Sequence, residues 1–164
     1  MKFPNLYPNW RLKDALVAVT PAQDRDLAAL AAIHRASFHR GWDETEFEGM
    51  LAEANTLLQV LRLGSVVAGF VVSRIALDES EILSIAVASD YRGRGHSRQL
   101  LQTHLGHLAG RGVKTVFLEV EENNLAARAL YDRFGFQLVG RRERYYQSAD
   151  GKQLNALVLR RDLS

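Results

Sequence analysis

Residues 81–101 read Glu81-Ile-Leu-Ser-Ile-Ala-Val-Ala-Ser-Asp-Tyr-Arg-Gly-Arg-Gly-His-Ser-Arg-Gln-Leu-Leu101. The run from Ile82 to Val87 is apolar and rich in Ile and Val, which favours a buried strand. A glycine-spaced turn follows at residues 92–97, and the amphipathic run after it predicts a helix. Because a helix start carries unpaired N–H donors and partial positive charge, this strand, turn and helix predict an anion site.

The composition fits one globular domain. The chain has 164 residues, of which 47% are hydrophobic and 24% charged, and these are ordinary values. Residues 1–13 hold two of the three prolines and predict an irregular lead-in, so we expect a single domain over residues 14–164. The absence of cysteine excludes disulfides and an acyl-cysteine intermediate. No signal peptide or bilayer-spanning run is present, which predicts a cytoplasmic protein without membrane contact.

Charge and histidine spacing argue against two other kinds of site. A net charge of +2 is compatible with binding anions but too small to indicate nucleic-acid readout. Arginine clusters at 92–98, 141–144 and 160–161 leave a nucleic-acid binder as an alternative, although no reading motif accompanies them. The five histidines lack the spacing of metal ligands, so we expect no metal.

The first half of the chain predicts two helices and a strand meander. Residues 15–19 predict a short strand, and Thr20-Pro21-Ala22-Gln23 predicts a helix start with a hydroxyl cap; that helix should end near residue 38. Asp43, with Glu46 three residues later, predicts the cap of a second helix. Residues 57–63, 66–75 and the strand before the turn should form an antiparallel meander.

The second half predicts alternating strands and helices. Residues 113–120 read as a strand and residues 124–134 as a helix that Gly135 ends. Residues 136–146 and 154–160 should pair as a hairpin across Asp150-Gly151. The order is therefore β-α-α-β-β-β-α-β-α-β-β, a mixed α/β (α+β) fold with a central sheet of about seven strands.

The glycine turn carries the pattern R-x-x-G-x-S at Arg92, Gly95 and Ser97. It lacks the third glycine of the dinucleotide fingerprint and the lysine of the nucleotide P-loop. The pattern is similar to the acyl-CoA pyrophosphate loop of the GNAT acetyltransferases, [Q/R]-x-x-G-x-[G/A], with serine in place of glycine or alanine. That serine would be strained if its position required a positive φ. A basic turn that opens an ordinary helix is the alternative.

Glu119 is a candidate general base. It lies in Thr115-Val-Phe-Leu-Glu-Val120, a strand that is largely apolar on both faces and hence central in its sheet. Burial among apolar side chains disfavours the charged form of a carboxylate, which suits a group that must accept a proton. The alternative is a carboxylate that turns to solvent or pairs with a nearby arginine.

A second motif follows at Asn123-Asn124-Leu-Ala-Ala-Arg-Ala-Leu-Tyr-Asp-Arg-Phe-Gly-Phe136. It matches N-x-x-A-x-x-L-Y-x-x-x-G-F, which is similar to the second GNAT hallmark, the helix and turn beside the CoA thiol. Together with Leu118-Glu-Val120 and Arg141-Arg-x-x-Tyr-Tyr146, it makes the chain resemble the bacterial RimI-type N-terminal acetyltransferases, which acetylate the α-amine of a ribosomal protein. The resemblance is strong over about residues 81–161, weaker over 15–80 and absent in 1–13.

The resemblance implies a GNAT fold, acetyl-CoA as acetyl donor, Glu119 as general base and Tyr131 as general acid. The residues that it implies for binding the CoA arm and pyrophosphate are Ile85, Ala86, Val87, Arg92, Gly93, Arg94, Gly95, His96, Ser97, Arg98 and Asn124. Those that it implies for the acceptor are Phe38, Trp42, Tyr145 and Tyr146. The alternative for Tyr131 is a tyrosine packed in the core, and for the late tyrosines it is ordinary strand aromatics.

The implied activity is that of an acyltransferase which acetylates a protein N-terminus, such as that of a ribosomal protein, by direct attack in a ternary complex. A GNAT enzyme that acetylates a small-molecule amine is an alternative. Another is a sensor that binds acetyl-CoA without turnover, which only Ser97 favours. We expect a monomer or a weak dimer.

Overall fold

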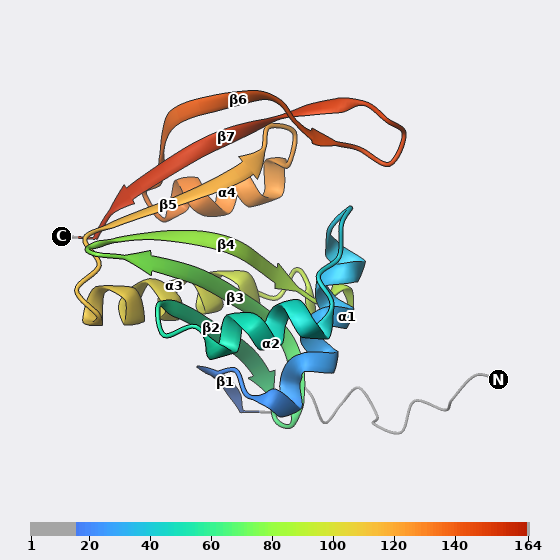
Figure 1. Cartoon of the computed structure of the whole chain (residues 1–164), viewed down its shortest axis with the longest axis vertical. Helices are drawn as coiled ribbons and strands as arrows, with labels where there is room; N and C mark the ends of the chain where they lie inside the picture. The colour runs from blue at the N-terminus through green and yellow to red at the C-terminus, as the bar shows by residue number, and fades with distance from the viewer. Residues whose placement is uncertain (1–15, 164) are drawn as a thin grey trace.

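The computed structural model describes residues 16–163 (Figure 1), so the expected irregular segment 1–13 lies outside the described residues. The strands are β1 (Val17–Pro21), β2 (Thr56–Leu63), β3 (Val66–Ala76), β4 (Glu79–Val87), β5 (Thr115–Glu121), β6 (Gln137–Gln147) and β7 (Gln153–Asp162). The helices are α1 (Leu27–Ser37), α2 (Glu44–Ala52), α3 (His96–Gly110) and α4 (Leu125–Arg133), with short 3-10 turns η2 (Asp24–Asp26) and η3 (Ser89–Tyr91). No helix in this part of the chain is both long and apolar enough to cross a membrane.

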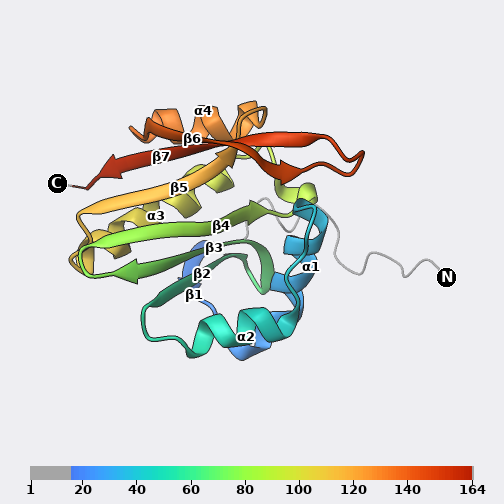
Figure 2. The ribbon, with the colours of Figure 1, turned by 45° about the horizontal axis from the view of Figure 1, so that its top comes forward.

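One mixed sheet with the strand order β1-β2-β3-β4-β5-β7-β6 runs through the molecule (Figures 1 and 2). β4 and β5 are parallel, and the other neighbouring strands are antiparallel. The predicted mixed α/β fold, the antiparallel meander and the late hairpin are therefore confirmed.

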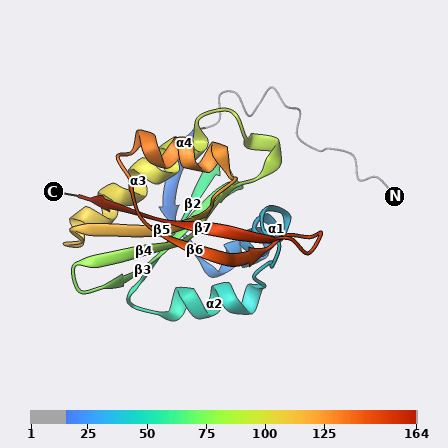
Figure 3. The same ribbon diagram turned by 90° about the horizontal axis from the view of Figure 1, so that it is seen from above.

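Helices cover the two faces of the sheet (Figure 3). On one face, Leu100 and Leu101 of α3 and residues of α4 pack on Val116 and Leu118 of β5. On the other face, α1 and α2 pack on β2 and β3. Alternation along β5 separates the two environments, because its even-numbered residues are buried against α3 and α4.

The start of the first helix differs from the prediction. Thr20 and Pro21 belong to β1, where they pair with Val60 and Gln59, so they do not cap a helix. Pairing with β2 outweighs the local cap signal, and β1 tolerates a terminal proline because it is an edge strand. The N–H of Gln23 instead donates to Asp26 Oδ2 over 2.9 Å, η2 follows, and α1 begins at Leu27.

The second helix begins as predicted. The N–H of Glu46 donates to Asp43 Oδ1 over 2.9 Å, and the N–H of Asp43 donates to Glu46 Oε2 over 3.0 Å. This reciprocal pair satisfies two donors that the helix start would otherwise leave free. It also fixes the point at which the chain leaves the connection between α1 and α2.

β4 and β5 pair over a short distance and then separate (Figure 1). Their ladder runs from Glu79↔Thr115 to Ile82↔Leu118 and ends there. The register between β3 and β4 shifts at the same place, between Val72 and Ser73. The rest of β4 therefore carries backbone groups that β5 does not use, and the two strands open a gap in the sheet.

Candidate active site

A cleft of about 570 Å³ occupies the gap between β4 and β5. The connection between α1 and α2 and residues of α4 and the β6–β7 hairpin also line it; α1 and the hairpin lie at the same end of the sheet (Figure 2). The predicted site residues that line it are Phe38, Trp42, Ile85, Glu119, Asn124, Tyr131, Tyr145 and Tyr146. The structure thus brings both predicted catalytic residues and all four predicted acceptor residues to one cleft.

Glu119 points to the α1–α2 side of the sheet, since its neighbours Leu118 and Val120 pack toward α3 and α4. Its side chain is 14% exposed, and Oε1 lies 2.9 Å from Nε of Arg142 on β6. This ion pair is the arginine pairing that the sequence analysis gave as the alternative for Glu119, so the surroundings of the carboxylate are not wholly apolar as predicted. Arg142 itself is held over the ring of Tyr145, 5.0 Å from its centroid.

Tyr131 approaches the cleft from the opposite face, on α4. Its ring packs edge-on against Phe136 with centroids 5.7 Å apart, and only 6% of the residue is exposed. Burial, with a smaller contribution from Tyr146, raises the pKa of Tyr131 well above its usual value. Its hydroxyl makes no hydrogen bond within residues 16–163 and keeps its proton at neutral pH, so it can donate that proton to a ligand.

The part of the cleft lined by Phe38, Trp42, Tyr145 and Tyr146 also contains polar residues that the sequence analysis missed. His39 Nε2 lies 3.4 Å from Oε1 of Glu121 and links the α1–α2 connection to β5. Glu121 follows Glu119 by two residues, so strand alternation alone could have placed it on the same face. The sequence analysis gave His39 no role, and it placed Arg142 only in an arginine cluster and in the pattern of residues 141–146, not beside Glu119. Burial and the Glu119 carboxylate raise the pKa of Tyr146 in this part of the cleft to about 12.

The glycine turn has the conformation that an anion site requires. Gly93 and Gly95 have φ values of +73° and +81°, and a Cβ at either position would meet open space. Gly95 is the N-cap of α3, followed by His96 and Ser97 in the helix. Ser97 is not among the described residues with positive φ, so the condition under which this serine would be strained is not met.

The arginines of the turn differ in their contacts. Arg92 Nε donates to the carbonyl of Val87 over 2.8 Å, and its Nη2 donates to Ser37 Oγ over 3.2 Å, so it ties the turn to β4 and α1. Two of the five guanidinium donors of Arg92 are therefore used within the protein, and the predicted contact with an anion stays a prediction. Arg94 is exposed at the turn.

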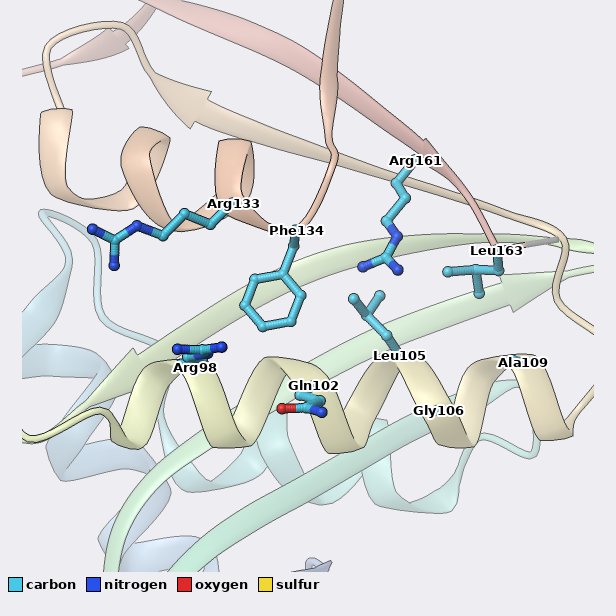
Figure 4. A pocket seen from close by; sticks show the side chains of 9 residues that line it. All are labelled: Arg98, Gln102, Leu105, Gly106, Ala109, Arg133, Phe134, Arg161 and Leu163. Atoms are coloured by element: carbon cyan, nitrogen blue, oxygen red, sulfur yellow. The ribbon is translucent and has the colours of Figure 1, made fainter.

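Arg98 lines a second cavity, of about 700 Å³, between α3, α4 and the end of β7 (Figure 4). Arg133 and Arg161 line the same cavity, and Phe134 and Leu105 form apolar parts of its wall. The sequence analysis did not assign Arg133 or Arg161 to a site. They lie far from Arg98 in sequence, so only tertiary packing reveals the cluster.

Asn124 caps α4 at the mouth of the first cleft. Its Oδ1 accepts the N–H of Ala127 over 3.2 Å, which leaves the amide nitrogen as the group that could contact a ligand. Ile85, Ala86 and Val87 lie beyond the end of the β4–β5 ladder, where β5 does not pair with their backbone. No group of three or more metal-ligating side chains occurs among the described residues.

Comparison with known proteins identifies the family of this chain. The model of the acetyltransferase (GNAT) family matches residues 27–136. The Escherichia coli (strain K12) [ribosomal protein bS18]-alanine N-acetyltransferase is 33% identical over 141 residues, covering 86% of this chain and 94% of the relative. The Mycobacterium tuberculosis N-alpha-acetyltransferase RimI is 38% identical over 125 residues, covering 74% and 75%.

A solved structure gives the same result. The crystal structure of the ribosomal-protein-S18-alanine N-acetyltransferase from Escherichia coli matches with a TM-score of 0.85 and 31% identity. The match covers 91% of this chain and 95% of that chain. The chain therefore belongs to the GNAT family of acetyltransferases, as its turn and helix motifs predict.

Proposed function

We propose that this protein transfers an acetyl group from acetyl-CoA to the α-amine of a protein N-terminus. The observation that carries the proposal is the gap between β4 and β5, which Glu119 enters from one face of the sheet and Tyr131 from the other. Relatives that match most of the chain are named as alanine N-acetyltransferases of ribosomal protein bS18. A ribosomal protein in the cytoplasm is therefore the acceptor that we propose.

The donor side fits the phosphates and arm of acetyl-CoA, which supplies an acetyl thioester. The N-terminus of α3, with two glycines that leave space, suits the pyrophosphate. The unpaired edge of β4 beyond Ile82 offers backbone groups to the amides of the pantetheine arm, and Asn124 offers its amide nitrogen. We assign the arginine-lined cavity at Arg98, Arg133 and Arg161 to the remaining phosphate at the nucleotide end.

The acid and the base have distinct tasks. An ammonium is not nucleophilic, so Glu119 accepts a proton from the acceptor amine, directly or through water. A backbone N–H near Val87 stabilises negative charge on the carbonyl oxygen under attack. Tyr131 donates its proton to the departing sulfur. The sequence contains no cysteine that could carry an acyl-cysteine intermediate, and we propose that the amine attacks the thioester directly while both substrates are bound.

The acceptor side is lined by aromatic rings and backbone. Phe38 and Trp42 from the α1–α2 connection face the cleft together with Tyr145 and Tyr146 from the hairpin. Flat rings on both sides suit an extended peptide better than a compact polar amine. This wall supports a peptide N-terminus as acceptor.

The test compares acceptors at fixed acetyl-CoA. Peptides with a free N-terminal alanine, the same peptides with a blocked N-terminus, and polyamines are incubated with the enzyme, and products are identified by mass. We expect kcat/KM for the free peptides to exceed that for polyamines by at least about 100-fold, and no product from blocked peptides. Acetylation of lysine side chains or polyamines at equal efficiency would overturn the assignment.

A further inference from the structure

The connection between α1 and α2, residues 38–43, forms the acceptor-side wall of the cleft. Phe38, His39, Arg40 and Trp42 line the cleft, yet residues 38–43 belong to no helix or strand. A segment without a regular hydrogen-bonding pattern keeps its shape through the side chains that contact it. Whatever fixes this connection therefore fixes the shape of the acceptor wall.

One buried imidazole contacts both ends of the connection. His34 lies in the last turn of α1 and is 3% exposed. Its Nδ1 accepts the backbone N–H of Trp42 over 2.9 Å. Its ring stacks on the Trp42 indole, with centroids 4.3 Å apart and 12° between planes, and lies 4.4 Å from the ring centroid of Phe38.

The hydrogen bond defines the protonation state of His34. Nδ1 can accept only in the neutral imidazole with its proton on Nε2. Burial lowers the pKa of His34 to about 4, and the opposing effect of Glu46 is smaller. His34 is therefore neutral at physiological pH, where it acts as a hydrogen-bond acceptor of fixed geometry and not as a proton carrier.

Neighbouring rings prevent the imidazole from rotating away. Phe47 of α2 and Phe70 of β3 lie 5.9 and 6.0 Å from it, centroid to centroid. Within residues 16–163 the N–H of Trp42 has no other acceptor. Loss of the imidazole nitrogen would leave this donor unpaired, and the connection would have to move to satisfy it.

We propose that His34 is a positioning residue that sets acceptor affinity by holding the 38–43 connection in place. The inference rests on the proposed function, because it takes the cleft to be the site of a peptide acceptor. His34 itself also lines the cleft, and none of its described hydrogen bonds or ring contacts involves the glycine turn or Tyr131, so we expect its loss to affect the acceptor alone.

Two variants separate the hydrogen bond accepted by Nδ1 of His34 from the packing of its ring. His34→Phe keeps an aromatic ring but removes the nitrogen, whereas His34→Asn loses the ring but keeps an oxygen near the position of Nδ1. For His34→Phe we expect KM for the peptide to rise about five- to thirty-fold, the range that a lost hydrogen bond produces. We expect kcat at saturating peptide and the Kd of acetyl-CoA to stay within about threefold. His34→Asn should recover most of the peptide KM.

Hydrogen exchange at the Trp42 amide gives a readout independent of catalysis. Exchange should accelerate at least tenfold in His34→Phe and return toward the parent rate in His34→Asn. Unchanged exchange would show that His34 does not hold the Trp42 amide. Equal peptide KM in all three proteins, or a parallel loss of acetyl-CoA binding and kcat, would overturn the proposal while the function stands. A parent enzyme that acetylates no peptide would overturn the proposed function and this inference together. If neither variant folds, slow exchange of the Trp42 amide in the parent supports its hydrogen bond to His34, and rapid exchange refutes that bond.

Discussion

Replacement of Tyr131 with phenylalanine tests the mechanism most directly, because it removes one oxygen and leaves the ring. The edge-on packing against Phe136 does not involve the hydroxyl, and that hydroxyl has no hydrogen-bond partner within residues 16–163. We therefore expect the free energy of unfolding to change by less than about 1 kcal/mol. A fall in rate then reports on chemistry and not on folding.

The size of the fall follows from the role of a general acid. Loss of a positioned acid lowers kcat by about 10²–10⁴, which corresponds to about 3–5 kcal/mol in the activation free energy. Burial keeps the pKa of Tyr131 well above its usual value, so the hydroxyl stays protonated throughout pH 6–9. The ratio of parent to variant kcat should therefore be the same at each pH in that range.

The assay follows release of CoA from acetyl-CoA with a saturating alanine-terminated peptide, and binding of acetyl-CoA is titrated separately. Tyr145→Phe is the matched control, since Tyr145 lines the same cleft but is 50% exposed. We expect it to retain kcat within about threefold. If Tyr131→Phe keeps kcat within about fivefold of the parent across pH 6–9, Tyr131 is not the acid.

Four further changes test other parts of the structure. Glu119→Gln should lower kcat by about 10²–10⁴ with little change in acetyl-CoA affinity, and a rate within a few-fold of the parent would exclude the base. Gly95→Val should abolish acetyl-CoA binding in a titration, whereas Gly151→Val, which has a similar φ of +82° in the turn between β6 and β7, should bind normally; equal titrations would show that the glycine turn before α3 does not bind the pyrophosphate. Arg161→Gln should weaken acetyl-CoA binding about five- to tenfold without affecting its 3′-dephospho analogue, and equal losses for both ligands would refute the phosphate assignment. Burial lowers the pKa of His104 to about 3, so the folded state binds fewer protons than the unfolded state below pH 6.5, and His34 acts in the same direction; urea unfolding should therefore show at least about 2 kcal/mol less stability at pH 5 than at pH 7.5, and no change would contradict the buried neutral rings.

Features that depend on a few neighbouring residues could be predicted from the sequence. The Asp43 cap, the glycine turn and the α4 helix are encoded in short patterns, and the structure contains each of them. Strand alternation also placed Glu119 on the opposite face of β5 from Leu118. In these cases the local preference and the global fold agree.

Features that arise from pairing across the fold could not be predicted. The Thr20-Pro21 cap signal is present in the chain, but pairing of β1 with β2 overrides it. Arg142 reaches Glu119 because β6 lies beside β7, which itself pairs with β5, and nothing near Glu119 in sequence indicates a guanidinium. Arg161 likewise reaches the α3–α4 cavity from the end of β7. Such contacts depend on strand order, which single-strand patterns do not contain.

The gap in the sheet explains how the proposed acid and the proposed base can act together although they lie on opposite faces of the sheet. A continuous sheet would separate Glu119, on the α1–α2 face, from Tyr131, which packs with α3 and α4 on the other face. Because the β4–β5 ladder ends at Ile82↔Leu118, the cleft beyond it opens to side chains from both faces. Donor and acceptor can then approach from opposite sides and meet between the strands, so neither has to leave before the other binds. Initial-rate lines at varied concentrations of both substrates should therefore intersect, and parallel lines would contradict direct transfer through the gap.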